Sequence, residues 1–270
     1  MNKPKRFYLE GSFGQIHCRG VFPSQAKKSG IVCCHMSPKS GKSFEDILPH
    51  LAKDRFAVAL DYPGYGESDP PPEHPHVTVE DYASAVWEVV DGLTAETVHL
   101  MGYHTGSMVS VEAAAQRRTQ VKSIINISAP IFTDEEQQQL HQEYSPIPLD
   151  EEGTRFKIMW ERVMYHRGPG MTLEMAAASY AENFRGGENY EFGHRAAFNY
   201  ANTYAKRLGA ETLPILVMNP KDDCYEQSRR ADELLQNGKR VDYPQWGHGF
   251  LSANAAEAAK EVLNFLEEND

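Results

Sequence analysis

The sequence predicts an α/β protein with a mostly parallel central sheet, helices on both faces and a helical insertion. Three observations predict this fold class. Apolar, β-branched runs alternate with helical patterns as far as residue 131, and the same alternation returns after residue 207. The stretch between them is helical in character and has no buried-strand pattern. Strands and helices that alternate along a chain are typical of a parallel sheet with crossover helices.

The elements follow in chain order. Strands are expected near 6–10 and 14–22, then at 30–34, 57–60, 96–101, 121–128 and 213–219. Helices are expected at 43–53, 79–93 and 107–115, and an amphipathic helix closes the chain. The lengths and the β-branched content of the apolar runs decide between strand and helix.

The domain organisation follows from where the alternation stops. We expect one α/β core made of residues 1–131 and 207–270, interrupted by a helical insertion at 132–206. Within the insertion, Pro146, Pro148 and the glycine pairs near 168–170 and 186–187 separate the helices. A chain of 270 residues with 41% hydrophobic residues is long enough to bury one such core.

A histidine stands at the centre of a glycine-flanked turn between a predicted strand and a predicted helix. The turn reads Gly102-Tyr103-His104-Thr105-Gly106. A strand that passes directly into a helix leaves little room, so small residues are needed two places on either side of the exposed central residue. The sequence therefore predicts that His104 projects over the edge of the sheet.

With this turn and the segments after it, the chain resembles the α/β-hydrolase superfamily, in which His104 takes the place of the nucleophilic serine. The family's order is nucleophile, acid, then histidine base. The resemblance implies that Asp223, after the 213–219 strand, is the acid, with Asp222 its neighbour. It implies that His248, in a Gly-flanked loop, is the base and that residues 132–206 form the family's cap.

Two further segments carry the same resemblance. Residues 35–38, His-Met-Ser-Pro, stand where the family has its oxyanion loop, although Met36 replaces the usual glycine. Residues 61–69 match the pattern D-x-P-G-x-G-x-S-D that follows the next strand. The resemblance implies that the backbone N–H groups of Ser37 and Thr105 bind the oxyanion.

The chemistry of imidazole leaves two roles open for His104. With an ordinary pKa near ~6.5, the ring is largely unprotonated at pH 7. It can attack an activated carbonyl as a nucleophile, or take a proton as a general base with His248 and Asp223 as a second proton relay. We therefore expect a hydrolase of a small carbonyl substrate, an ester, a lactone or a C–C bond, that needs no organic cofactor.

Other functions stay open, because a fold does not fix a function. One alternative is a lyase or another proton-transfer enzyme, and a second is a non-catalytic ligand-binding protein. His104, His248 and Asp223 also form a ligand set that suits zinc or iron, but no metal-type spacing supports it, so no metal is expected.

Composition and charge limit the kinds of partner that this protein can have. The net charge of −11 argues against nucleic acid. No apolar run is long enough to span a membrane, and the first six residues lead into a strand rather than a signal-peptide core, so we expect a cytoplasmic protein. The partner is a small-molecule substrate. Basic and acidic residues nearly balance over 151–207, which indicates either an anionic substrate or solvated, ion-paired helices. The sequence does not predict an oligomeric state.

Overall fold

An eight-stranded sheet forms the centre of the molecule, in the order β1-β2-β4-β3-β5-β6-β7-β8. The computed structural model describes residues 3–71 and 77–270. β2 pairs antiparallel with β1 and β4, and every other neighbouring pair of strands is parallel. The predicted fold class is therefore confirmed. The strands are β1 (Lys5–Gly11), β2 (Gly14–Val21), β3 (Gly30–Cys34), β4 (Ala57–Leu60), β5 (Val98–Tyr103), β6 (Val121–Ile127), β7 (Ile215–Pro220) and β8 (Gly238–Tyr243).

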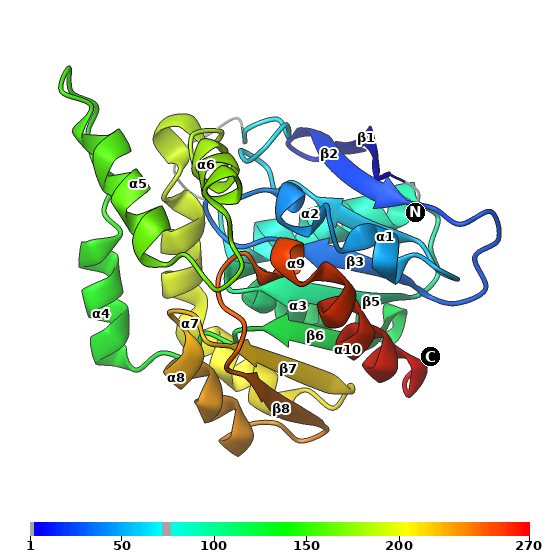
Figure 1. Cartoon of the computed structure of the whole chain (residues 1–270). Helices are drawn as coiled ribbons and strands as arrows, with labels where there is room; N and C mark the ends of the chain where they lie inside the picture. Colours follow the sequence, from blue (N-terminus) through cyan, green and yellow to red (C-terminus); the bar gives the residue numbers. More distant parts are fainter. Residues whose placement is uncertain (1–2, 72–76) are drawn as a thin grey trace.

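Helices cover both faces of the sheet (Figure 1). Apolar side chains of α2, α3 and α7 form the core on one face, and those of α1, α9 and α10 form the core on the other. No helix of the described residues is both long enough and apolar enough to cross a membrane. The α-helices are α1 (Leu48–Leu51), α2 (Val79–Gly92), α3 (Thr105–Gln116), α4 (Asp134–Glu143), α5 (Thr154–Tyr165), α6 (Leu173–Glu182), α7 (Phe192–Ala210), α8 (Tyr225–Ser228), α9 (Phe250–Ala253) and α10 (Ala255–Glu267).

Four α-helices, α4 to α7, and one short 3₁₀ helix, Gly187–Asn189, connect β6 to β7, and we call residues 134–210 the α4–α7 segment. Figure 1 shows α4, α5 and α6 standing beside the sheet, while α7 returns to it. One isolated bridge joins Arg167, in this segment, to His248. The segment therefore lies against the loop that carries His248.

The sequence was wrong about two elements. The single helix expected at 43–53 is a 3₁₀ helix, Gly41–Phe44, followed by a separate short α1 that begins at Leu48. Pro49 occupies the first turn of α1, where a missing N–H costs nothing, so it starts a new helix rather than continuing one. β8 was not predicted, because it is an edge strand whose Lys239, Arg240 and Asp242 hide any apolar alternation.

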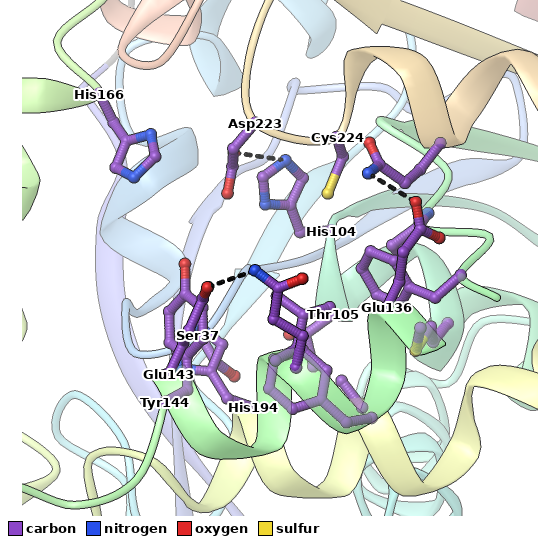
Figure 2. A pocket seen from close by; sticks show the side chains of 18 of the residues that line it. Ser37, His104, Thr105, Glu136, Glu143, Tyr144, His166, His194, Asp223 and Cys224 are labelled. Carbon is purple, nitrogen blue, oxygen red and sulfur yellow. Dashed lines mark hydrogen bonds and ion pairs between the residues drawn. The ribbon is translucent and has the colours of Figure 1, made fainter. Parts of the chain in front are cut away.

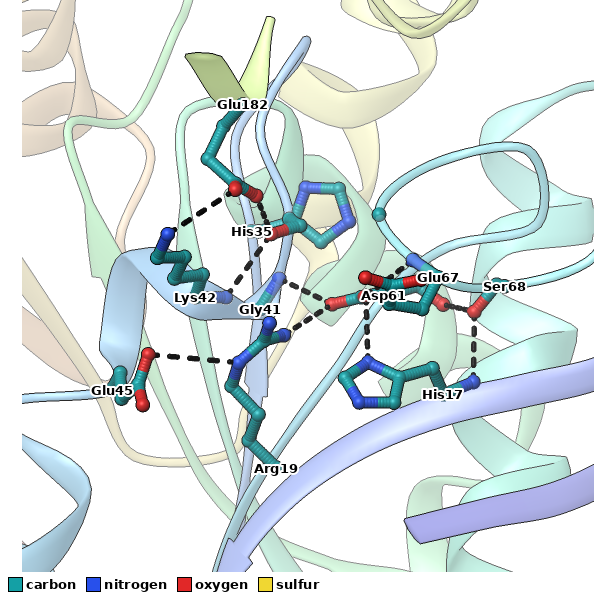
Figure 3. A network of polar contacts seen from close by, with 12 residues as sticks. His17, Arg19, His35, Gly41, Lys42, Glu45, Asp61, Glu67, Ser68 and Glu182 are labelled. Atoms are coloured by element: carbon teal, nitrogen blue, oxygen red, sulfur yellow. Dashed lines mark hydrogen bonds and ion pairs between the residues drawn. The ribbon is translucent and has the colours of Figure 1, made fainter. Parts of the chain in front are cut away.

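A buried carboxylate, Asp61, ties the loops together at the end of β4 (Figure 3). It accepts hydrogen bonds from the backbone N–H groups of Gly41, at 2.8 Å, and Glu67, at 2.9 Å. It also pairs with His17 at 2.8 Å and with Arg19 at 3.2 Å. Gly66 passes so close that a Cβ there would lie 2.0 Å from Asp61 Oδ2. Asp61 therefore fixes the loop 61–69 and the turn after β3 in one position.

We expect Asp61→Ala to lower the free energy of unfolding by about 3 kcal/mol or more, because it leaves the buried Arg19, the buried N–H of Gly41 and the partly buried N–H of Glu67 without their acceptor. Urea unfolding measures the change. The control is Asp91→Ala, since Asp91 forms an exposed pair with Arg117 and such pairs contribute about 1 kcal/mol or less. Equal losses in the two variants would contradict the role given to Asp61.

Candidate functional site

His104 lies at the sharp turn where β5 passes into α3. Its backbone angles are φ 48° and ψ −111°, a conformation that side-chain-bearing residues rarely adopt. The His104 N–H donates to the carbonyl of Ile127 at 3.0 Å, and its own carbonyl accepts from Ser107 N at 2.8 Å. These bonds hold the strained residue at the carboxyl edge of the sheet, where ligands bind in open α/β folds.

The two glycines of the turn are required by close packing. A Cβ on Gly102 would lie 2.0 Å from the carbonyl oxygen of Gly106, and a Cβ on Gly106 would lie 1.9 Å from that of Cys34. Any side chain at either position would push the start of α3 away from the sheet. The spacing of the two glycines in the sequence therefore indicates the close packing of α3 against the sheet.

The imidazole of His104 is held by Asp222. Its Nε2 lies 3.0 Å from Asp222 Oδ2. The same oxygen accepts from Ser128 Oγ at 2.6 Å and from Tyr103 OH at 3.3 Å, while Oδ1 accepts from the N–H of Cys224 at 3.0 Å. Nδ1 of His104 forms no hydrogen bond with any residue that the structure describes. Asp222 was not predicted to contact His104, and its only signal in the sequence was its place beside Asp223 after β7.

His248 is held by Asp223, the aspartate that the resemblance indicated. His248 Nε2 lies 2.7 Å from Asp223 Oδ1, which is also 3.7 Å from Nε2 of His104. The rings of His104 and His248 are nearly perpendicular, with centroids 5.4 Å apart. The three residues named from the sequence thus come together, as two histidines that each contact their own aspartate.

The paired aspartates change the charge of His104. Burial alone would lower its pKa, but the charges of Asp222 and Asp223 outweigh burial and raise the pKa to about 9. Burial would likewise raise the pKa of both carboxyls, and the neighbouring imidazoles hold both below the usual value. His104 is therefore protonated at neutral pH. The sequence had suggested a largely neutral ring, because it did not show two carboxylates at one imidazole.

Ser37 and Thr105 lie on the same cavity as His104 (Figure 2). Within the described residues, neither backbone N–H has a hydrogen-bond acceptor. His35 fixes the Ser37 loop, since its Nε2 accepts from Tyr62 N at 3.0 Å and its Nδ1 lies 2.8 Å from the carbonyl of Met36. Burial lowers the pKa of His35 to about 4, so this ring is neutral and structural.

Two adjoining lobes of a cavity meet at this site. The large lobe, about 360 Å³, extends toward α4 and α7 and is partly apolar, with Phe132, Leu140 and Phe198 in its wall. The small lobe, about 130 Å³, extends toward α5 and α6 and includes Lys39, Arg162 and Asn183. Both lobes are lined by Ser37, His104, Tyr144, His166, His194 and Asp223. The shared residues place His104 where the two lobes join.

The same cluster contains donor atoms that could hold a metal ion. One atom from each of His104, Asp222, Asp223 and His248 lies within 4.8 Å of the others. Imidazole and carboxylate are ligands of zinc and of non-haem iron. The hydrogen bonds described above already pair these atoms with one another, so the geometry suits proton transfer equally well.

Comparisons with known proteins agree with this fold. The pattern of the α/β hydrolase fold family matches residues 31–252, and the chain belongs to that family. Haloalkane dehalogenase 2 of Mycobacterium tuberculosis is 29% identical over 119 residues, which are 44% of this chain and 40% of that protein. The non-heme chloroperoxidase of Burkholderia pyrrocinia is 23% identical over 260 residues, 88% of this chain and 91% of that protein.

Solved structures show the same architecture. The enol-lactonase of Burkholderia xenovorans superimposes with a TM-score of 0.78 and 16% identity, covering 97% of this chain and 100% of its own. Epoxide hydrolase A of Mycobacterium thermoresistibile gives 0.80 with 16% identity, and 99% of each chain is covered. At this identity the likeness establishes the fold alone.

The contact between His104 and Asp222 gives a measurable prediction. Asp222→Asn removes the negative charge bonded to the ring, so the pKa of His104 should fall from about 9 toward the ordinary value of an imidazole. A titration followed by NMR of the imidazole nitrogens measures it. Asp232→Asn is the control, because Asp232 is a half-exposed carboxylate that pairs with Arg240 and should leave His104 unchanged. An ordinary pKa for His104 in the unmodified protein would contradict the electrostatics.

Proposed function

We propose that the chain hydrolyses a small carbonyl substrate at an ester, a lactone or a C–C bond, and that it needs no organic cofactor. The observation that carries the proposal is the bond from His104 Nε2 to the buried carboxylate of Asp222, which leaves Nδ1 on the cavity side. A carboxylate that holds one nitrogen of an imidazole fixes the tautomer and stabilises the charged ring, as a general base requires. Relatives named as dehalogenase, enol-lactonase and epoxide hydrolase support hydrolysis of a small molecule.

In the proposed mechanism, a water molecule replaces the serine of the usual nucleophile elbow. Nδ1 of His104 takes a proton from the water as the water oxygen bonds to the substrate carbonyl. The N–H groups of Ser37 and Thr105 act as the oxyanion hole. His104 then gives up this proton, and His248, held by Asp223, is the second proton relay that passes it to the leaving group, so both rings return to their starting state. The α4–α7 segment acts as the cap that closes the cavity.

A second role is open to His104, because the same Nδ1 faces the cavity. As a nucleophile it bonds to the carbonyl carbon and expels the leaving group, and water then hydrolyses the acyl-imidazole.

The four cysteines are free and buried, which supports a reducing, cytoplasmic location. A lyase and a non-catalytic binding protein are the competing functions that the following measurements separate.

The first test is turnover and its dependence on pH. We expect one class among small esters, lactones and β-keto compounds to be hydrolysed. Because the raised pKa of about 9 keeps His104 protonated at neutral pH, kcat/KM should rise about tenfold per pH unit and level off above about 9. Rates without enzyme are subtracted at each pH. A rate that falls as the pH passes through 9 would mean that the protonated ring is the working form and would contradict the base.

Removal of the ring should abolish the reaction. We expect His104→Ala to lower kcat by about 10²–10⁴-fold, the usual contribution of a general base, with circular dichroism showing an intact fold. His50→Ala, on α1 and away from both lobes, is the matched control and should keep full activity. A chelator should change neither rate. Loss of activity with chelator, together with stoichiometric metal, would replace the proposal by a metal site. Binding without turnover across the panel would favour a binding protein, and cleavage without uptake of water would favour a lyase.

Rapid-quench mass spectrometry separates the two roles of His104. If His104 is a general base, the mass of the protein should stay unchanged throughout the first turnover of a slow ester. An acyl adduct that maps to His104 would instead establish the nucleophile. His104→Ser is the informative companion variant, because it restores the usual serine and should gain an adduct at residue 104 if the oxyanion donors are in place.

A further inference from the structure

A lysine that forms no ion pair with any described residue lies in the wall of the small lobe. Lys39 follows the Ser37–Pro38 loop, and its Nζ donates to the carbonyl of Ser179 at 2.7 Å, to Ser179 Oγ at 2.8 Å and to Oδ1 of Asn183. All three acceptors are neutral and belong to the end of α6. Burial lowers the pKa of this ammonium to about 7. At neutral pH the amine is therefore only about half protonated, and an anion bound beside it would raise its pKa and keep it charged.

The acidic groups that face this lysine are engaged elsewhere. Glu182 on α6 accepts from Ser40 Oγ at 2.5 Å and pairs with Lys42 at 3.5 Å. Within the small lobe, Glu191 pairs with Arg162 at 3.5 Å and with His194 at 2.5 Å. Asp223 contacts the two catalytic candidates described above. No carboxylate of the described residues forms an ion pair with Lys39.

Of the two alternatives that the sequence left open for the charge balance over residues 151–207, the ion pairs favour solvated, ion-paired helices over an anionic substrate. Several basic side chains of this stretch pair with glutamates: Arg155 with Glu188, Arg162 with Glu191, Arg185 with Glu67, and Arg207 with Glu112. These four do not indicate an anionic ligand. The cation that does lies outside the stretch, on the loop after β3.

We propose that the substrate of this site carries a carboxylate, which replaces one of the three neutral acceptors of Lys39 Nζ in the small lobe and also accepts from the hydroxyl of Ser179, while its reacting carbonyl lies at His104. The inference rests on the proposed hydrolase function. The Ser179 hydroxyl accepts from Lys39 and keeps its own proton to donate to an anion. Because Ser37, His104 and Asp223 line both lobes, a substrate anchored in the small lobe extends its other end into the large, partly apolar lobe.

A pair of nearly isosteric esters tests the charge. Monomethyl succinate carries a carboxylate where methyl butyrate carries a methyl group. We expect the unmodified protein to prefer the half-ester in kcat/KM by about tenfold or more, the effect of a charge-assisted contact. Lys39→Met should reduce the ratio to about one. Lys42→Met is the matched control, because Lys42 lies on the same turn and pairs with Glu182, and it should keep the preference.

A second variant keeps the lysine. Asn183→Asp is isosteric and places a fixed carboxylate beside Nζ, so it should abolish the preference even if Lys39→Met fails to fold. Binding is measured separately by thermal unfolding with succinate, which should raise the Tm of the unmodified protein and of Lys42→Met but of neither other variant.

The outcomes distinguish this site from the proposed function. Turnover of both esters with a ratio near one, or an unchanged ratio in Lys39→Met and Asn183→Asp, overturns the carboxylate site and leaves the hydrolase. An equal rise in Tm with succinate in all variants also overturns it. Protection by succinate that is lost in both variants, without turnover of any ester, lactone or β-keto compound of the panel, supports the anion site and contradicts the hydrolase.

Discussion

The buried charge of Asp222 is the interaction on which the candidate site depends. An ionised carboxylate in a dry position is unstable unless several donors surround it. Here the donors come from the ends of three neighbouring parallel strands: Tyr103 at the end of β5 and His104 after it, Ser128 after β6, and the N–H of Cys224 after β7. His104 and Ser128 both have positive φ, 48° and 57°. Their bonds to one carboxylate help to offset the backbone strain that aims both side chains at it.

Much of the fold could be predicted because its core strands are short apolar runs separated by amphipathic helices. β3, β4, β5, β6 and β7 are buried on both faces and leave a strong pattern in the sequence. β8 left none, because an edge strand needs polar side chains on its open side. The single helix expected at 43–53 is two helices, because Pro49 fits only in the first turn of a helix and therefore starts α1.

The candidate site, like the fold, could be predicted from the sequence only in part. His104, Asp223 and His248 could be named because the glycine turn and the order of the motifs are properties of the chain itself. Asp223 could also be named as the partner of His248, but the partner of His104 could not be named, because Asp222 and Asp223 are adjacent in sequence and only the fold separates their side chains. Asp222 is buried beneath His104, while Asp223 is about a third exposed beside His248. Lys39 could not be singled out from the sequence, because only the folded chain shows that its amine is held by three neutral acceptors and forms no ion pair with any described residue.

The distribution of charge around the cavity imposes an orientation on any anionic ligand. Two ionised aspartates stand behind the histidines, and they repel an anion more strongly once His104 has given up its proton. The small lobe offers the opposite field, with Lys39 at its α6 wall. In the proposed reaction a carboxylate is therefore attracted to Lys39 and kept away from the aspartates, so the carbonyl rather than the carboxylate faces His104. In this arrangement the aspartates raise the pKa of His104 at one end of the bound substrate. Lys39 binds the substrate carboxylate at the other end, so the two negative charges stay apart.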